Sequence, residues 1–354
     1  MKIRNKNQLN ILWIGIIALL IAGCSSLSSN DSAKKEEKIK LISNEEKPYI
    51  GFILDTLKDE RWYKDKGLFE EEVKNLGGQV KTLAANGLDD VQIKQAELLI
   101  KEGVDVLVVV PHNADIASEI INLAHKSKVK VISYDRLIKN SKVDYYISFD
   151  NVKVGQLQAS ELIKKHPKGN FAYIGGAESD NNAVLFRQGA MKVLQPLIDK
   201  GDIKLVYDHY TEEWDPKQAK KNMNKALNKN NNKVDAVIAA NDGIAGGVIE
   251  SLTSASLAKK VLVSGQDAEL EGIRRIVKGT QTMSVYKPIS MLATKSAEIA
   301  VKVAKGETIE TDRKINNGTI DVPSILLEPI SVTKENVRET VIKDGYLTEE
   351  EVFN

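Results

Sequence analysis

From residue 48 onward, the chain alternates between two patterns of apolar residues. Short runs that are apolar at almost every position, such as YIGFIL at 49–54 and DVLVVV at 105–110, predict strands buried on both faces. Longer segments whose apolar residues recur every three or four positions, such as 89–101, predict amphipathic helices. Glycines that follow two of these helices, Gly77-Gly78 and Gly103, are typical helix ends. Together the two patterns predict a parallel sheet covered by helices on both faces.

The number of predicted strands indicates more than one sheet. The predicted strands span 49–54, 80–84, 105–110, 129–134, 145–149, 170–175, 203–207, 235–240, 260–264 and 282–286, and the predicted helices span 62–76, 89–101, 114–125, 152–165, 181–197, 216–228, 242–253 and 270–278. Ten strands are too many for one compact unit in 354 residues, so we expect an α/β protein with two doubly wound parallel-sheet lobes. A weak similarity between DVLVVVPHNADI (105–116) and DAVIAANDGIAG (235–246) supports two related halves, although the sequence pattern common to all βαβ units also produces such a similarity.

The first 24 residues follow a different pattern. A basic start precedes an apolar run at 11–21, which is too short to span a bilayer comfortably and is typical of a signal peptide. The sequence Ile21-Ala22-Gly23-Cys24 then resembles the end of a bacterial lipoprotein signal, which implies that Cys24 is the lipid attachment site. Cys24 is the only cysteine, so no disulfide competes for it; the alternative is a buried thiol behind an uncleaved anchor.

Residues 25–45 are rich in Ser, Lys and Glu and have little to bury, which predicts a flexible tether. A lipid anchor followed by a tether places the folded part outside the cytoplasm, held at the cell membrane. The composition of the whole chain, with 42% hydrophobic and 28% charged residues, is that of a soluble globular protein. A net charge of +1 gives no reason to expect a nucleic-acid partner.

Polar side chains follow the predicted strands. In open parallel sheets, ligands bind beyond the carboxyl ends of the strands, so these positions are candidates for a binding site. In chain order they are Asp55, residues 58–62 (KDERW), residues 111–113 (PHN), Asp135-Arg136, Asp180 to Asn182 with Arg187, Trp214-Asp215, Asn241-Asp242, Gln266-Asp267 and Lys287.

These residue types predict a carbohydrate site. Asp, Asn, Arg and Lys accept hydrogen bonds from, or donate them to, vicinal hydroxyls. Of three tryptophans, one is in the signal, and Trp62 and Trp214 each follow a strand in a different half. An indole face buries the C–H face of a sugar ring without removing hydroxyl hydrogen bonds. We therefore interpret Asp135-Arg136 as one of several strand-end pairs that point into a common cleft, rather than as an ordinary salt-bridged strand end.

Several candidates have a structural alternative. Asp215 and Asp242 stand where helices begin, so we interpret them as N-caps rather than ligands. Asn182 and Asn241 are equally compatible with caps or turns. The remaining alternatives are a helix staple for Trp62, a local ion pair for Arg187, a solvated helix start for Lys287, and a structural or rim role for His112, which has no second metal ligand at suitable spacing.

An enzyme is an alternative of a different class, and common catalytic motifs would indicate one. The sequence contains no G-x-S-x-G, P-loop or H-E-x-x-H motif. Gly175-Gly176 lacks the other glycines of a dinucleotide loop, and Gly246-Gly247 lies within a predicted helix. We therefore expect no catalytic activity, no cofactor and no metal.

Longer segments carry a family resemblance. From about residue 48 to the end, the chain resembles the sugar-binding proteins of ABC importers in the ribose, galactose and xylose class, and most of all the D-xylose-binding type. The segments that carry it are DERWYKDKGLFEE, VISYDRLI, YYISFDNVKVGQLQA, GGAESDNNAVLFRQGAMKVL, VDAVIAANDGIAGG, SGQDAELEGIRRI and GTQTMSVYKPI. The resemblance implies the type I periplasmic binding protein fold, in which three crossovers join two α/β lobes around a pyranose.

The resemblance also implies a set of sugar contacts. They are Arg61, Trp62, Asp135 and Arg136 from the N-terminal lobe, Asp180, Asn182, Trp214, Asn241 and Asp267 from the C-terminal lobe, and Lys287 at a crossover. Arg187 and His112 rank lower. The expected lobes are 46–149 with 287–322, and 150–286 with 323–354.

The function implied is capture of a monosaccharide, D-xylose first, for delivery to an ABC permease. An alternative keeps the binding event but has the liganded receptor report to a sensor histidine kinase. An enzyme using Lys287 lacks a metal set or a nucleophile–base pair. A transcription repressor with a related core is disfavoured, because the signal sequence stands where the DNA-binding helices belong.

Overall fold

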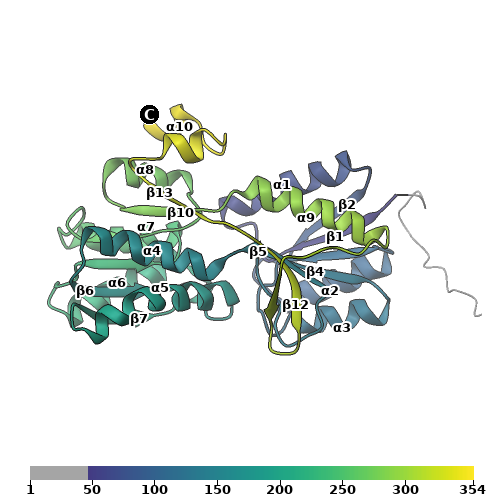
Figure 1. Cartoon of the computed structure of the whole chain (residues 1–354), viewed down its shortest axis with the longest axis horizontal. Helices are drawn as coiled ribbons and strands as arrows, with labels where there is room; N and C mark the ends of the chain where they lie inside the picture. Colours follow the sequence, from purple (N-terminus) through teal and green to yellow (C-terminus); the bar gives the residue numbers. More distant parts are fainter. Residues whose placement is uncertain (1–46) are drawn as a thin grey trace, which may run out of the picture. The chain divides into compact units, whose positions relative to one another are not determined.

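A seven-stranded sheet forms the first half of the fold (Figure 1). Its strands are β1 (Tyr49–Leu54), β2 (Gln79–Ala84), β3 (Val106–Val109), β4 (Lys130–Tyr134), β5 (Tyr145–Phe149), β11 (Arg313–Asn316) and β12 (Asp321–Leu327), in the spatial order β11-β12-β5-β4-β3-β1-β2. All neighbours are parallel except β11 and β12, which are antiparallel. The structure is a computed structural model that describes residues 47–354, and all of these belong to one compact unit, Ile39–Asn354.

Both faces of this sheet are apolar because side chains alternate along each strand. In β1, Ile50 and Phe52 pack in one buried cluster and Tyr49 and Ile53 in another. The first cluster is completed by α1 (Glu60–Asn75) and α9 (Ile289–Ala304), and the second by α2 (Asp89–Lys101) and α3 (Ser118–Lys126). We call this sheet and its four helices the N-terminal lobe.

The C-terminal lobe contains a second parallel sheet in the order β7-β6-β8-β9. Its strands are β6 (Gly169–Ile174), β7 (Ile203–His209), β8 (Ala236–Ala239) and β9 (Leu262–Val263), and its helices are α4 (Asn151–Lys165), α5 (Asn181–Asp199), α6 (Pro216–Lys229), α7 (Asp242–Ser254) and α8 (Leu270–Lys278). A two-stranded antiparallel sheet of β10 (Met283–Tyr286) and β13 (Ile330–Thr333) extends it through a parallel bridge between Gln266 and Val285. The turn Glu212–Trp214, the π-helical turn Arg338–Ile342 and α10 (Glu349–Phe353) complete the lobe.

The chain passes between the sheets after β5, after β10 and after β12. The third passage differs from the expected boundary between residues 322 and 323. Ser324 to Leu327 pair with Tyr146 to Phe149 of β5, so they remain in the N-terminal lobe. The expected assignment of residues 323–327 to the C-terminal lobe is therefore wrong, because β12 continues as a full parallel strand before the chain crosses.

The N-terminal expectations lie outside the described residues. These are the signal peptide 1–24, the lipid attachment at Cys24 and the tether 25–45. Within residues 47–354, no helix is both long enough and apolar enough to cross a membrane.

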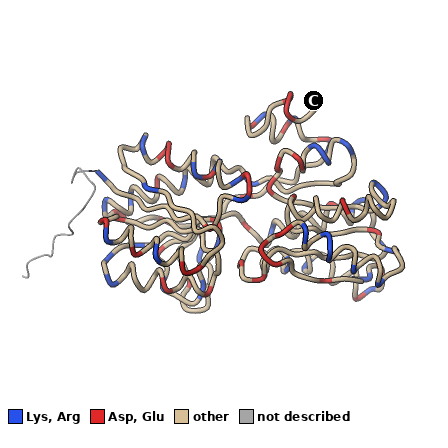
Figure 2. Tube along the Cα trace, turned by 180° about the vertical axis from the view of Figure 1, so that it is seen from behind, with Lys and Arg blue, Asp and Glu red and all other residues tan. Residues whose placement is uncertain are grey.

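Charges on the outside of the described part are mixed in sign. Figure 2 shows Lys and Arg interspersed with Asp and Glu along the helices of both lobes. Pairs such as Lys64–Glu60 and Lys94–Asp90 are one helical turn apart and lie at the surface, with Lys64 half-buried and the other three side chains exposed. Such pairs contribute only about 0–1 kcal/mol each to stability. The electrostatics that decide function therefore lie in the buried charges.

Two glycines allow α4 and α5 to pack closely against each other. A Cβ added at Gly155 of α4 would lie 1.9 Å from the carbonyl oxygen of Phe186, and one added at Gly189 of α5 would lie 2.0 Å from that of Val152. Both clashes are with backbone, so a side chain there forces the helices apart. This packing fixes the start of α5, which carries Asn182.

Gly155→Ala should therefore lower the free energy of unfolding by about 1–3 kcal/mol through overpacking. Gly67→Ala is the matched control, because Gly67 is also in a helix but a Cβ there meets nothing within 4 Å. The control should be neutral or stabilising by up to about 1 kcal/mol. Urea unfolding of both variants measures this, and equal effects would contradict the packing argument.

Candidate ligand-binding site

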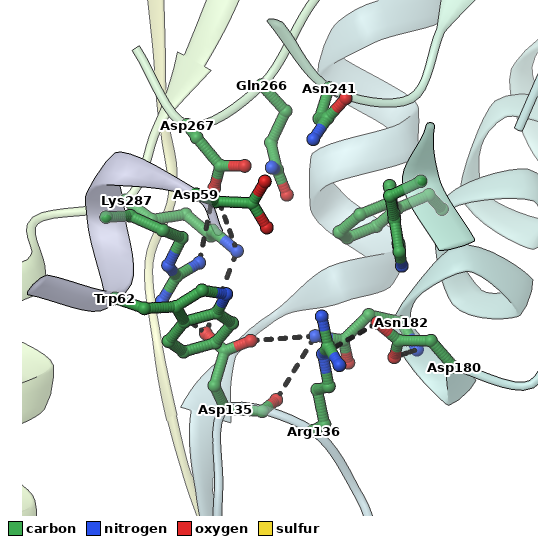
Figure 3. Close-up of a pocket in the computed structure, with 13 residues that line it drawn as sticks. Asp59, Trp62, Asp135, Arg136, Asp180, Asn182, Asn241, Gln266, Asp267 and Lys287 are labelled. Carbon is green, nitrogen blue, oxygen red and sulfur yellow. Dashed lines mark hydrogen bonds and ion pairs between the residues drawn. The ribbon is translucent and has the colours of Figure 1, made fainter. Parts of the chain in front are cut away.

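A cavity lies where the carboxyl ends of strands from both lobes meet (Figure 3). Its lining consists of Asp59, Arg61, Trp62, Asp135, Arg136, Asp180, Asn182, Phe186, Trp214, Asn241, Gln266, Asp267 and Lys287. All ten residues that the sequence analysis selected first are among them. The structure thus brings together residues that are up to 226 positions apart, from Arg61 to Lys287.

Arg61 pairs with three buried carboxylates. Its guanidinium makes ion pairs with Asp65 (Nε–Oδ2, 3.3 Å), Asp135 (Nη2–Oδ2, 3.0 Å) and Asp267 (Nη1–Oδ1, 3.2 Å). Lys287 lies beside it, with Nζ 3.7 Å from Asp135 Oδ2 and 3.4 Å from Asp267 Oδ1. Because Asp135 follows β4 and Asp267 follows β9, these cations connect the two lobes.

Arg136 forms a second connection between the lobes. Its Nη1 lies 2.6 Å from Oδ2 of Asp55, in the N-terminal lobe, and its Nε lies 2.8 Å from Oδ2 of Asp180, in the C-terminal lobe. Asn182 adds an amide hydrogen bond, donating from Nδ2 to Asp135 Oδ1 at 2.9 Å. The two adjacent charges at the end of β4 thus each bind a residue of the opposite lobe, so they are more than a local strand-end pair.

The backbone at the site is strained. Asp135, Trp214 and Asp267 have backbone φ values of 58°, 53° and 90°. Residues other than glycine rarely adopt this region. The Asp135 carbonyl is held there by hydrogen bonds from Tyr146 Oη (3.1 Å) and Ser148 Oγ (2.5 Å). Strain of this kind persists only where surrounding contacts enforce it, and it is concentrated at functional sites.

The ionisation of Asp135 reflects these neighbours. Burial alone would raise its pKa, but the charges of Arg61, Lys287 and Arg136 together lower the pKa of Asp135 to about 2. The carboxylate is therefore ionised at neutral pH despite being 2% exposed. Its charge is balanced within the protein, so a ligand needs no charge of its own to enter.

Two of the lining residues are helix caps as well. The Asp180 side chain accepts from the Asn182 N–H at the start of α5, and that of Asn241 accepts from the Ile244 N–H at the start of α7. Asp215 also caps its helix, accepting from the Lys217 N–H, as the sequence analysis expected, and it does not line the cavity. A cap role and a place in the cavity are thus compatible in the same side chain.

The interpretation of Asp242 as an N-cap is wrong. It is the first residue of α7 and is fully buried, and its carboxylate accepts hydrogen bonds from Ser284 Oγ (2.9 Å), Gln281 Nε2 (2.6 Å) and the Glu269 N–H (2.9 Å). Burial raises the pKa of Asp242 to about 7, against the opposing influence of Arg275. Asp242 therefore ties α7 to β10 and α8 from behind the cavity.

Both tryptophans line the cavity. The Arg61 guanidinium carbon lies 4.3 Å from the centroid of the Trp62 ring, and Trp214 meets Phe186 edge-on at 6.4 Å. Trp214 fits only because residue 176 is glycine, since a Cβ there would lie 2.1 Å from the indole. The Nε1 atoms of both indoles are buried without a hydrogen-bond partner among the described residues.

The two lower-ranked residues lie elsewhere. Arg187 is on α5 outside the cavity, and its Nε donates to Asp208 Oδ1 at 3.1 Å, which is the local pair considered from the sequence. His112 lines a neighbouring cavity, and its Nδ1 lies 2.9 Å from Asp55 Oδ1. His112 thus supports the carboxylate that holds Arg136.

Asp59, Phe186 and Gln266 also line the cavity. Asp59 and Gln266 are among the strand-end candidates of the sequence but not among the sugar contacts that the resemblance implies, and Phe186 is not a sequence candidate at all. Phe186 lies one turn into α5 and has no polar group to mark it. Within residues 47–354, no group of three His, Cys, Asp or Glu residues could hold a metal ion. The arrangement can hold a small neutral ligand that carries several hydroxyls, through fixed donors and acceptors.

Comparison with known proteins identifies the family. Residues 50–308 match the model of the periplasmic binding protein domain, so the chain belongs to this family of substrate-binding proteins. The chain is 47% identical over 334 residues to the D-xylose-binding periplasmic protein of Escherichia coli, covering 94% of this chain and 98% of that protein. It is 50% identical over 305 residues to the D-xylose-binding periplasmic protein of Haemophilus influenzae, covering 86% of this chain and 92% of that one.

A solved structure supports the same assignment. The solute-binding protein of a carbohydrate transporter from Chloroflexus aurantiacus, in complex with D-glucose, has a TM-score of 0.81 at 32% identity, covering 86% of this chain and 98% of that chain. The type I periplasmic binding protein fold expected from the sequence is thereby confirmed.

The charge on Asp135 predicts a pH effect on stability. Because its folded-state pKa of about 2 lies below the ordinary value of 3.8, ionised Asp135 stabilises the fold above about pH 4, and this contribution is lost as the pH falls from about 4 to about 2. Asp135→Asn lacks it. The difference in the free energy of unfolding between wild type and variant should shrink over that interval, as measured by urea unfolding. A difference that stays constant down to about pH 2 would contradict the assigned charge state.

Proposed function

We propose that this protein captures D-xylose between its two lobes and delivers it to an ABC permease. The observation that carries the proposal is the cavity between the lobes, in which Asp, Asn, Arg and Lys side chains stand beside Trp62 and Trp214. The three carboxylates Asp135, Asp180 and Asp267 are paired with Arg61 and Arg136, so these groups offer hydrogen bonds to a neutral ligand. The identity of about half to D-xylose-binding periplasmic proteins supports this sugar.

The two lobes are expected to close around the sugar, because its proposed contacts come from both lobes. Asp135 and Arg136 belong to the N-terminal lobe, and Asp180 and Asp267 to the C-terminal lobe. A small ligand that contacts both lobes favours the arrangement in which the lobes are together. Three crossovers allow hinge bending, so an open form is expected without sugar.

Reporting to a sensor histidine kinase uses the same binding event, and no comparison favours it over transport. The sugar-bound form is the shared starting point of both roles. Identification of the sugar therefore comes first.

Calorimetric titration of the purified full-length protein with D-xylose, D-ribose and D-glucose tests the proposal. We expect D-xylose to bind most tightly, because the relatives of about half identity are D-xylose-binding proteins and because a sugar of different hydroxyl arrangement leaves buried polar groups unpaired. Equal affinity for D-glucose would overturn the xylose assignment and leave the fold untouched.

Two aspartates serve as a matched pair of variants in the same titration. Asp135→Ala should weaken binding by at least about 2 kcal/mol, because it removes one of the three carboxylates that pair with Arg61 and leaves a sugar hydroxyl without an acceptor. Asp215→Ala should leave binding unchanged, since Asp215 caps α6 outside the cavity. Equal losses without unfolding would contradict the separation of ligands from caps.

We also propose that Cys24 anchors the protein to the outer face of the cell membrane through a lipid, supported by the pattern Ile21-Ala22-Gly23-Cys24. Cys24→Ser should move the protein from the membrane fraction to the soluble fraction without changing sugar affinity, because the site lies more than 30 residues further along the chain. Fractionation followed by immunoblotting measures this. Retention of the variant at the membrane would mean that another element or a protein partner holds it.

A further inference from the structure

Asp59 occupies a capping position without acting as a cap. It precedes α1, its backbone is extended (φ −91°, ψ 140°), and its side chain makes no cap hydrogen bond. By contrast, Asp150, Asp180 and Asp215 precede α4, α5 and α6, and each accepts a backbone N–H of its helix. Aspartate is favoured at this position because of that bond. The side chain of Asp59 is therefore directed to something other than its own helix.

That side chain lines the ligand cavity. Figure 3 shows the Asp59 carboxylate beside Gln266 and Asp267, directed toward the space between the lobes. The other three carboxylates of the lining are paired: Asp135 and Asp267 with Arg61, and Asp180 with Arg136. No hydrogen bond or ion pair is formed by the Asp59 side chain within residues 47–354.

A second unsatisfied acceptor lies next to it. The Oε1 atom of Gln266 is buried and has no hydrogen-bond partner among the described residues, and Gln266 is only 2% exposed. A buried acceptor left without a donor costs about 1–3 kcal/mol, so such groups in a native protein call for a partner. Asp59 and Gln266 Oε1 thus place two acceptors without partners among the described residues at one corner of the cavity.

The charges that line this corner of the cavity indicate that the Asp59 carboxylate pairs with a ligand rather than with a cation of the protein. Burial raises the pKa of Asp59; Arg136 opposes this and Asp267 adds to it. The lining contains four carboxylates against three cations, Arg61, Arg136 and Lys287. The surplus carboxylate is Asp59. Sugar hydroxyls can donate to it without bringing a charge, whereas an anionic ligand would be repelled.

We propose that Asp59 is a specificity-determining contact that accepts a hydrogen bond from one hydroxyl of the bound sugar, with Gln266 Oε1 as the neighbouring acceptor. This rests on the proposed function and adds a position to its site. The ligand class it selects is a neutral sugar with a free hydroxyl at this corner. A sugar whose hydroxyl is missing or methylated there loses the contact.

The test is a mutant cycle on the purified full-length protein, with D-xylose and its 2-, 3- and 4-deoxy analogues titrated into wild type, Asp59→Ala and Asp59→Asn. We expect Asp59→Ala to weaken D-xylose binding by at least about tenfold and Asp59→Asn by less, because Asn keeps one acceptor. With one deoxy analogue, the effect of Asp59→Ala should nearly vanish, since the hydroxyl that Asp59 contacts is already gone. Asp215→Ala is the control and should bind every sugar as the wild type does.

A purely structural role for Asp59 predicts the same loss with every analogue, and that result would overturn the inference, as would equal binding of D-xylose by Asp59→Ala and wild type. Asp59→Asn keeps the shape of the side chain, so it decides the matter if Asp59→Ala unfolds. In either case the proposed function stands, because it depends on D-xylose binding by the wild type. A wild type that binds none of the sugars would instead overturn the proposed function and this inference together.

Discussion

The buried carboxylate of Asp135 has contacts on which most of the site depends. It accepts from Arg61 of α1, lies near Lys287 and accepts from Asn182 of the opposite lobe. Removal of a charge from water is costly, and opposite charges and hydrogen bonds must compensate for it. Here three cations, Arg61, Arg136 and Lys287, are held near carboxylates from both lobes. The position of each lobe against the other is therefore linked to the same few contacts that line the cavity.

This network explains why the site suits a neutral sugar. A cavity in which every charged side chain except Asp59 is paired internally does not need a counter-ion in the ligand, but it still presents ionised donors and acceptors, which form the stronger hydrogen bonds. Their positions are fixed by packing behind them: Asp55 holds Arg136, Asp65 holds Arg61, and Asp242 ties α7 to its neighbours. Rigid positions reduce the entropy lost when a ligand binds, and they make the arrangement of hydroxyls the basis of selection.

The sequence predicted the strands, helices and cavity residues of the βαβ units well, because these have strong apolar periodicity and end in polar residues. It did not predict α9 or the strands β11 to β13. The strand β11 is largely exposed at the edge of a sheet and alternates weakly, and β12 contains Pro323, so neither gives the continuous apolar pattern of a central strand. The lobe boundary at residues 322 and 323 was misplaced for the same reason.

Within the site, the misinterpretations arise where a residue type has two common roles. Asp242 stood at a helix start, and only the tertiary contacts with Ser284 and Gln281 show that its carboxylate points away from the helix end. Asp59 is the opposite case: it stands at a cap position and forms no cap. The local sequence pattern predicts which residues lie at a strand end. Whether such a residue caps a helix, forms buried structural hydrogen bonds or contacts a ligand depends on side chains that are distant in the sequence.

The central claim is that the strand-end residues of both lobes enclose one sugar ring between Trp62 and Trp214. A crystal structure of the protein grown with D-xylose tests it most directly. The account predicts one pyranose in the cavity, with its hydroxyls within hydrogen-bond distance of Asp135 and Asp267 and its ring against the indoles. A sugar bound elsewhere, or a ring that contacts residues of a single lobe, would contradict the account.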